Sequence, residues 1–122
     1  MNILVVDDER DVQTLFEQRF RREIRSGEFQ FFFTFSGEEA LNCLEKEDSE
    51  IVLILSDINM PGMSGLELLQ SIRQTHPNSP PVVMMITAYG DDETHAQALQ
   101  LGANDFLTKP LNFGELKDKL KE

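Results

Sequence analysis

The chain alternates short apolar runs with longer stretches in which apolar residues recur at helical spacing. The apolar runs are residues 1–6, 29–35, 51–55 and 82–86, with a shorter and weaker run at 105–107. Each run is too short for a stable helix and predicts a strand. Helical spacing follows each run, within residues 12–24, 40–44, 68–72, 93–101 and 113–120. The sequence therefore predicts five strand–helix pairs.

Strands and helices that alternate strictly are joined by right-handed crossovers, which make the sheet parallel and place helices on both of its faces. The runs are almost continuously apolar, as strands covered on both sides should be, except for the aromatic run 29–35. We therefore predict an α/β fold, a doubly wound five-stranded parallel sheet, with 29–35 at an edge.

Polar residues and glycines mark the ends of the predicted helices. Ser36 and Ser64 each stand three positions before a glutamate, which is the pattern of a capping box, and Asn112 is suited to cap the last helix. Gly27 and Gly102 are typical of helix ends.

The length and net charge of the chain limit the number of domains and the kinds of ligand that it can have. The 122 residues fit one domain, 1–122, and the last helix ends so soon after it begins that the piece is compatible with a cut from a longer protein. With 22 acidic and 11 basic residues the net charge is −11, which argues against binding of nucleic acid or anionic membranes and favours cations or basic protein faces. No apolar run could span a bilayer and no signal peptide is seen, so we expect a cytoplasmic protein.

Polar residues follow four of the predicted strands. They are Asp7 and Asp8, then Asp57, Thr87 and Lys109. In an open parallel sheet, ligands bind beyond the carboxyl ends of the strands. Three carboxylates meeting there would repel one another unless a cation neutralised them, and oxygen-only ligands suit Mg²⁺ better than zinc. A carboxylate beside Mg²⁺ can attack phosphorus, while Lys109 neutralises charge and Thr87 donates a hydrogen bond to a phosphoryl oxygen.

Four segments together resemble the signature of response-regulator receiver domains. They are Val5-Val6-Asp7-Asp8-Glu9, Ser56-Asp57-Ile58-Asn59-Met60-Pro61-Gly62-Met63-Ser64-Gly65, Ile86-Thr87-Ala88-Tyr89-Gly90 and Leu107-Thr108-Lys109-Pro110. Each motif alone is weak, but four in order at predicted strand ends are specific, and the resemblance covers nearly the whole chain. It implies a flavodoxin-like (βα)5 sandwich with strand order 2-1-3-4-5.

The resemblance also implies roles for the site residues. Asp57 would be the phosphorylated aspartate of a signalling switch that catalyses only its own phosphorylation and dephosphorylation. Mg²⁺, or Mn²⁺, would be held by the side chains of Asp8 and Asp57 and the backbone carbonyl of Asn59, with Asp7 acting through water. Thr87 and Lys109 would bind the phosphoryl group, and Lys109-Pro110 would be a cis bond.

Further expectations from the resemblance concern switching and partners. Thr87 and Phe106 would form the switch, and Asn59 and a bulky Tyr89 would set how fast the phosphoryl group is hydrolysed. The donor would be a histidine kinase or a phosphotransfer protein. The face built from helix 93–101, strand 105–107 and helix 113–120 would contact an output domain, a partner or a second receiver as a homodimer.

Other interpretations compete at each position. Asp8 could cap the first helix, Asp7 could be a solvated strand end, Thr87 could be a plain strand-end hydroxyl, and Phe106 could be core. A purely structural role does not account for Asp57, because an acid at the end of an apolar central strand is costly to bury without a partner. A haloacid-dehalogenase-like phosphatase would want a second aspartate where Asn59 stands, and a docking module that ignores phosphate would not need these residues.

Overall fold

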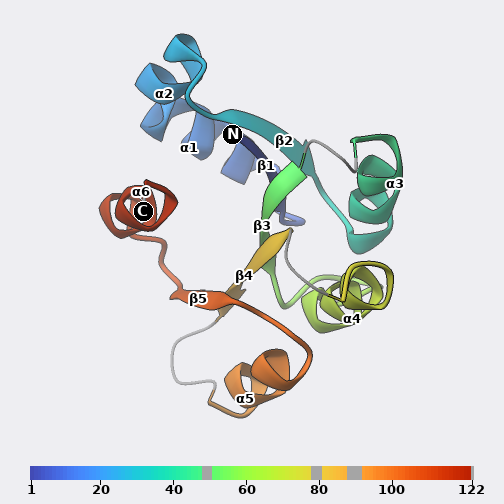
Figure 1. Cartoon of the computed structure of the whole chain (residues 1–122). Coiled ribbons are helices and arrows are strands. Elements are labelled where there is room, and N and C mark those ends of the chain that lie inside the picture. Colours follow the sequence, from blue (N-terminus) through green and yellow to red (C-terminus); the bar gives the residue numbers. More distant parts are fainter. Residues whose placement is uncertain (48–50, 78–80, 88–91, 122) are drawn as a thin grey trace.

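The computed structural model describes residues 1–47, 51–77, 81–87 and 92–121. Five strands form one parallel sheet in the order β2-β1-β3-β4-β5 (Figure 1). The strands are β1 (Asn2–Val6), β2 (Gln30–Thr34), β3 (Ile51–Asp57), β4 (Val82–Thr87) and β5 (Asp105–Thr108). The predicted fold class and strand order are confirmed, and the aromatic strand β2 lies at an edge.

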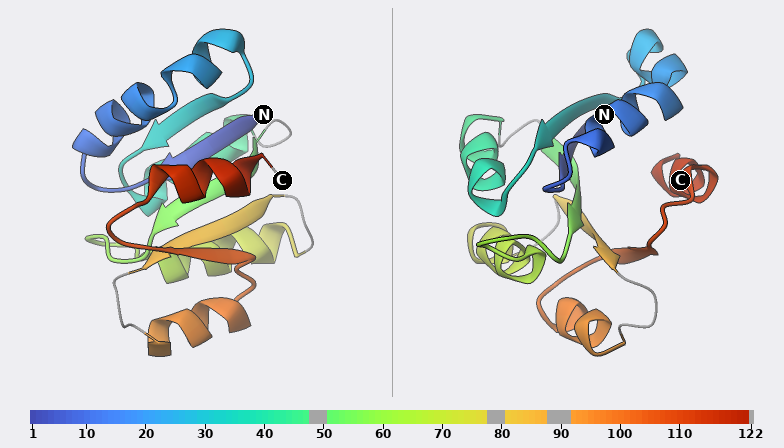
Figure 2. Two further views of the ribbon diagram at one scale, coloured as in Figure 1. Left: turned by 90° about the vertical axis from the view of Figure 1, so that its left-hand side faces the viewer. Right: turned by 180° about the vertical axis from the view of Figure 1, so that it is seen from behind.

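Helices cover both faces of this sheet (Figures 1 and 2). One face carries α1 (Asp11–Arg19), α2 (Arg21–Ser26) and α6 (Phe113–Leu120), and the other carries α3 (Gly37–Glu47), α4 (Gly65–Thr75) and α5 (Asp92–Gln100). Successive strand residues pack into opposite cores, so Ile3 and Val5 lie under α1 and α6 while Leu4 and Val6 lie under α3 and α4. Among the described helices, none has the length and apolar character to cross a membrane.

The predicted helix caps are present. Ser36 Oγ accepts a hydrogen bond from the Glu39 amide at 3.1 Å, Ser64 Oγ accepts from the Glu67 amide at 3.2 Å, and Asn112 Oδ1 accepts from Glu115 at 3.0 Å. Each bond satisfies an amide of the first turn that has no partner within the helix, so these side chains fix where α3, α4 and α6 begin.

The helix expected over residues 12–24 is instead two helices, which corrects the sequence prediction. The break falls at Phe20, whose φ of −109° and ψ of 21° are not helical. The fully buried Phe20 ring stacks on Phe16 at 5.8 Å and contacts Phe31 of β2 at 5.1 Å. Because aromatic packing fixes Phe20, the chain changes direction there, and Ile24 lies exposed while Glu23 turns inward.

Glu23 is a buried acid that lies beside Lys117 of α6 and Lys121, the residue that caps the end of α6. It is only 5% exposed, and its Oε2 lies 3.4 Å from Lys117 Nζ and 3.6 Å from Lys121 Nζ. Burial alone would raise the pKa of Glu23, but a backbone hydrogen bond and the two lysines outweigh it and hold the pKa below the ordinary value of 4.5. This ion pair joins α2 to α6.

Two neighbouring residues of α1 test the orientation of that helix. Phe16 is fully buried, whereas its apolar neighbour Leu15 is 43% exposed. We expect Phe16→Ala to lower the free energy of unfolding by about 3–5 kcal/mol and Leu15→Ala by less than about 1 kcal/mol, measured by urea denaturation. If Phe16→Ala does not fold, Phe16→Leu serves with the same ranking. Equal losses would contradict the described orientation.

The Glu23 ion pair makes stability depend on pH. Because the pKa of Glu23 is lower in the folded protein than in the unfolded chain, its carboxylate stabilises the fold above pH 4.5, and this contribution is lost as pH falls through the folded pKa. We therefore expect the stability advantage of the wild type over Glu23→Gln to shrink as pH falls from about 6 to 3. A constant difference in unfolding free energy across that range would refute the assignment.

Candidate functional site

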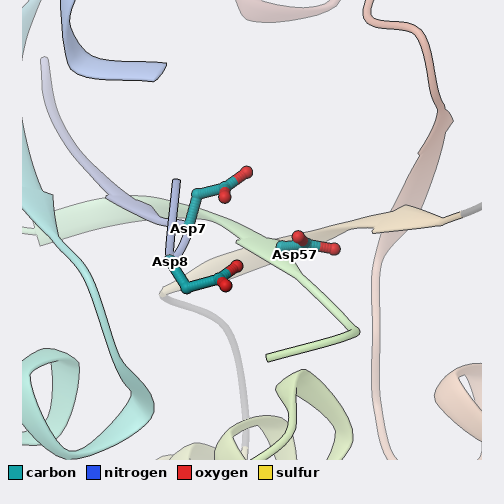
Figure 3. A group of neighbouring side chains, drawn as sticks. All are labelled: Asp7, Asp8 and Asp57. Atoms are coloured by element: carbon teal, nitrogen blue, oxygen red, sulfur yellow. The ribbon is translucent and has the colours of Figure 1, made fainter. Parts of the chain in front are cut away.

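Three carboxylates meet beyond the carboxyl ends of the central strands. Asp7 and Asp8 directly follow β1, and Asp57 is the last residue of β3. One oxygen from each lies within 4.8 Å of the others, and Figure 3 shows the three side chains converging on one space. Asp7 and Asp57 are buried, and Asp8 is exposed. The parallel sheet therefore gathers the acids as the sequence predicted.

Lys109 reaches this cluster from the segment after β5. Its Nζ donates a hydrogen bond to Asp57 Oδ2 at 2.8 Å. Its backbone amide donates to Thr87 O at 2.8 Å, which continues the β4–β5 ladder beyond Thr108. The peptide bond between Lys109 and Pro110 is cis, as the resemblance implied.

The cluster of three acids and Lys109 holds more negative than positive charge. Burial raises the pKa of Asp7, opposed by the Glu9 amide that donates to Asp7 Oδ1 at 2.9 Å, and the charges of Asp57 and Asp8 raise it further. Burial lowers the pKa of Lys109, but the hydrogen bond to Asp57 and the charges of Asp57, Asp7 and Glu9 outweigh burial, so the net shift is upward. Lys109 therefore stays protonated, yet one ammonium faces three acids.

The donor set fits a hard divalent cation. Asp7, Asp8 and Asp57 offer only carboxylate oxygens, which suits Mg²⁺ or Mn²⁺ and not zinc. Asp8 is available for this role, because Arg10 is the N-cap residue of α1 and no side-chain hydrogen bond caps that helix. The Asn59 amide donates to Asp57 Oδ1 at 3.3 Å, so the chain after β3 folds back over the acid, and the Asn59 side chain is exposed.

The two expected switch residues lie on β4 and β5. Thr87 is buried at the end of β4, one residue beyond Ile86, which pairs with Asp57 in the sheet register. Phe106 is half-buried in β5, and its ring centroid lies 3.6 Å from that of His95 on α5. Tyr89, expected to influence hydrolysis, lies outside the described residues.

Gly65, the first residue of α4, helps to place Asp57, a role that was not predicted from the sequence. Its amide donates to Ile58 O at 2.8 Å, and a Cβ added to it would lie 2.7 Å from Ile58 Cα and would also overlap the carbonyl oxygen of Asp57. The start of α4 therefore rests directly on the backbone that carries Asp57. The sequence does contain a sign of this close contact. Glycine is a poor helix former, so its position directly after the capping Ser64 indicates that a side chain would not fit there.

The chain belongs to the response regulator receiver domain family. The sequence model of that family, described as the response regulator receiver domain, matches residues 3–121. The match includes every strand and helix described above except Asn2, the first residue of β1. This assignment agrees with the convergence of Asp57, Lys109 and the two N-terminal acids at one edge of the sheet.

Several known proteins are similar over nearly the whole chain. The response regulator protein PilR of Pseudomonas aeruginosa is 42% identical over 118 residues, 94% of this chain and 24% of that protein. Sporulation initiation phosphotransferase F of Bacillus subtilis is 32% identical over 98% of this chain and 90% of that protein. A chain in the co-crystal structure of the Saccharomyces cerevisiae phosphotransfer protein Ypd1 with the receiver domain of Ssk1 matches with a TM-score of 0.86 and 26% identity, covering 99% of this chain and 86% of that one.

The curated relatives differ in length from this chain. It spans a quarter of PilR, and 47–49% of several other response regulators and transcriptional regulatory proteins. The segment shared with all of them is the receiver domain. The activities and partners of the longer proteins belong to those whole proteins and are not assigned to this chain.

Charge repulsion in the acidic cluster predicts a stabilising substitution. We expect Asp7→Asn to raise the free energy of unfolding by about 0.5–2 kcal/mol when divalent cations are chelated, because the amide keeps the Glu9 hydrogen bond and removes a buried charge. Denaturation in urea with EDTA measures this. Asp118→Asn, an exposed acid on α6, is the control and should change stability by less than about 0.5 kcal/mol. A destabilised Asp7→Asn protein would contradict the described electrostatics.

Proposed function

We propose that residues 1–122 are a phosphoacceptor domain in which Asp57 receives a phosphoryl group from a phosphohistidine. The observation that carries the proposal is the buried Asp57 carboxylate, held at 2.8 Å by Lys109 within a cluster of three acids. The donor is a sensor histidine kinase or a phosphotransfer protein. The similarity to a sporulation phosphotransferase and to a receiver solved with a histidine phosphotransfer protein supports this choice.

The chain's acids fit the divalent cation that this reaction requires. Asp8 and Asp57 would bind it through their side chains and Asn59 through its backbone carbonyl, with Asp7 acting through water. Bound there, Mg²⁺ or Mn²⁺ supplies positive charge that neutralises the phosphoryl oxygens. The excess of negative charge in the cluster supports such a ligand.

The residues present supply the remaining chemistry. A carboxylate oxygen of Asp57 attacks phosphorus, so that a P–O bond forms while the P–N bond to the donor histidine breaks and its electron pair stays on the imidazole. The Lys109 ammonium, which donates to Asp57, transfers its hydrogen bond to a phosphoryl oxygen. Thr87 donates a second hydrogen bond. Asn59 and Tyr89 would determine how long the acyl phosphate survives.

The phosphorylated state would be read on the face formed by α5, β5 and α6. The added charge draws Thr87 and Lys109 toward the phosphoryl group, and Phe106 moves into the space that Thr87 leaves. Movement of Phe106 changes its contact with His95 and so the packing of α5 on β5. An output domain, a partner protein or a second receiver would bind the altered face. The domain thus works as a switch and not as an enzyme with turnover on an external ester.

Phosphorylation by a small donor tests this proposal without a kinase. Incubation with phosphoramidate and Mg²⁺ should add one phosphoryl group, seen by intact-protein mass spectrometry, and Asp57→Asn should abolish the addition. Lys109→Gln should lower the rate by about a hundredfold, because a hydrogen-bond donor to the transferring group is lost. Lys46→Gln, an exposed lysine on α3, should stay within about twofold of the wild type.

Two outcomes would overturn the proposal. One is an undiminished mass addition in Asp57→Asn, which would place the acceptor elsewhere. The other is labelling at the normal rate after divalent cations are removed with EDTA, which would show that the acidic cluster needs no metal ion.

A further inference from the structure

The chain concentrates its scarce basic residues at one place. Residues 19–25 and 117–121 hold seven of the 11 lysines and arginines but only two of the 22 acids. These segments belong to α1, α2 and α6, which share one face of the sheet (Figures 1 and 2). In a protein with a net charge of −11, these two segments therefore have the opposite sign of charge to the rest of the chain.

A hollow lies within this region, which we call the basic groove. Its volume is about 510 Å³, and it is lined by Arg19, Arg21, Arg22 and Arg25 together with Glu23 and with Lys117 of α6. The salt bridge from Lys117 to Glu23 holds α6 against α2, so the helices that border the groove are fixed to one another. The groove is therefore part of the packed fold.

The guanidinium groups of the basic groove are available to a ligand. Arg21, Arg22 and Arg25 are exposed, and within the described ranges no carboxylate lies in ion-pair distance of them. Arg19 lies over the Phe113 ring at 5.6 Å, a contact that orients its guanidinium without neutralising it. Arginine is the residue best suited to carboxylates, because its planar group donates two parallel hydrogen bonds.

Glu23 is the one acid among the residues that line the groove, and two lysines balance its charge. Its Oε2 faces Lys117 and Lys121, whereas its buried Oε1 has no hydrogen-bond partner among the described residues. Because Oε1 is enclosed by the protein, a ligand in the groove does not reach it. The groups that the groove presents to a ligand are therefore the exposed guanidinium groups, which favour an anionic ligand.

An acidic peptide is such a ligand. Its carboxylates match the planar guanidinium groups of the arginines. A nucleic acid fits less well, because its charges continue along the strand and would meet the acidic surface beyond the groove. We infer that the basic groove binds a short acidic peptide segment of a partner protein.

The basic groove lies away from the phosphoacceptor site. Asp57 and Lys109 are at the carboxyl ends of the strands, whereas α2 and the end of α6 lie at the opposite end of the sheet, close to both chain termini (Figure 2). Peptide binding therefore does not require access to Asp57, and the inference does not depend on phosphorylation.

Fluorescence anisotropy with fluorescein-labelled hexaglutamate tests the inference on the chain 1–122. We expect saturable binding at low ionic strength, weakening as salt rises from about 50 to 200 mM, and no binding of labelled hexaglutamine. The double variant Arg22→Gln/Arg25→Gln should raise Kd by about tenfold. Both side chains are exposed, so the variant should fold, as circular dichroism would verify.

The matched control is Lys46→Glu, which lowers the net charge by the same two units on α3, across the sheet from the groove. It should change Kd by less than about threefold. Equal weakening in the control and the double variant, or no binding of hexaglutamate at low salt, would overturn the inference. Tighter binding of hexathymidylate than of hexaglutamate at the same ionic strength would also overturn it, in favour of a nucleic acid ligand.

Discussion

The hydrogen-bonded ion pair between Lys109 and Asp57 fixes the carboxyl end of the sheet, where the candidate site lies. An ionised carboxylate only 3% exposed is costly to bury, and the lysine ammonium at 2.8 Å with the Asn59 amide at 3.3 Å offsets that cost. Asp57 ends β3 whereas Lys109 follows β5, and β4 lies between them. The ion pair therefore connects the carboxyl ends of β3 and β5 across β4. It also holds the ammonium beside the Asp57 carboxylate.

The carboxyl end of the sheet holds more negative charge than its own basic residues can balance. Asp7 and Asp8 add two carboxylates to the one that Lys109 neutralises, and burial makes the charge on Asp7 unfavourable. A site optimised for stability would replace one of these acids with an amide. Keeping all three carboxylates agrees with the divalent cation proposed for this cluster, which would balance the excess negative charge.

The sequence predicted most of this arrangement because polar residues directly after apolar runs must gather where parallel strands end. Asp7, Asp8, Asp57 and Lys109 were found in that way, and the caps Ser64 and Asn112 fixed the helix starts. The break at Phe20 could not be predicted, because contacts with Phe16 and Phe31 decide it against a continuous helical pattern. Burial of Glu23 likewise depends on lysines that are remote in sequence.

The contact beneath Gly65 limits which substitutions the start of α4 can accept. Because the first turn of α4 meets the main chain at Asp57 and Ile58 directly, the backbone that carries Asp57 is positioned by the main chain of α4. The outward side chains of α4 take no part in this contact. Substitutions on that face therefore leave the Asp57 carboxylate in place, whereas any side chain at position 65 would push the helix away from it.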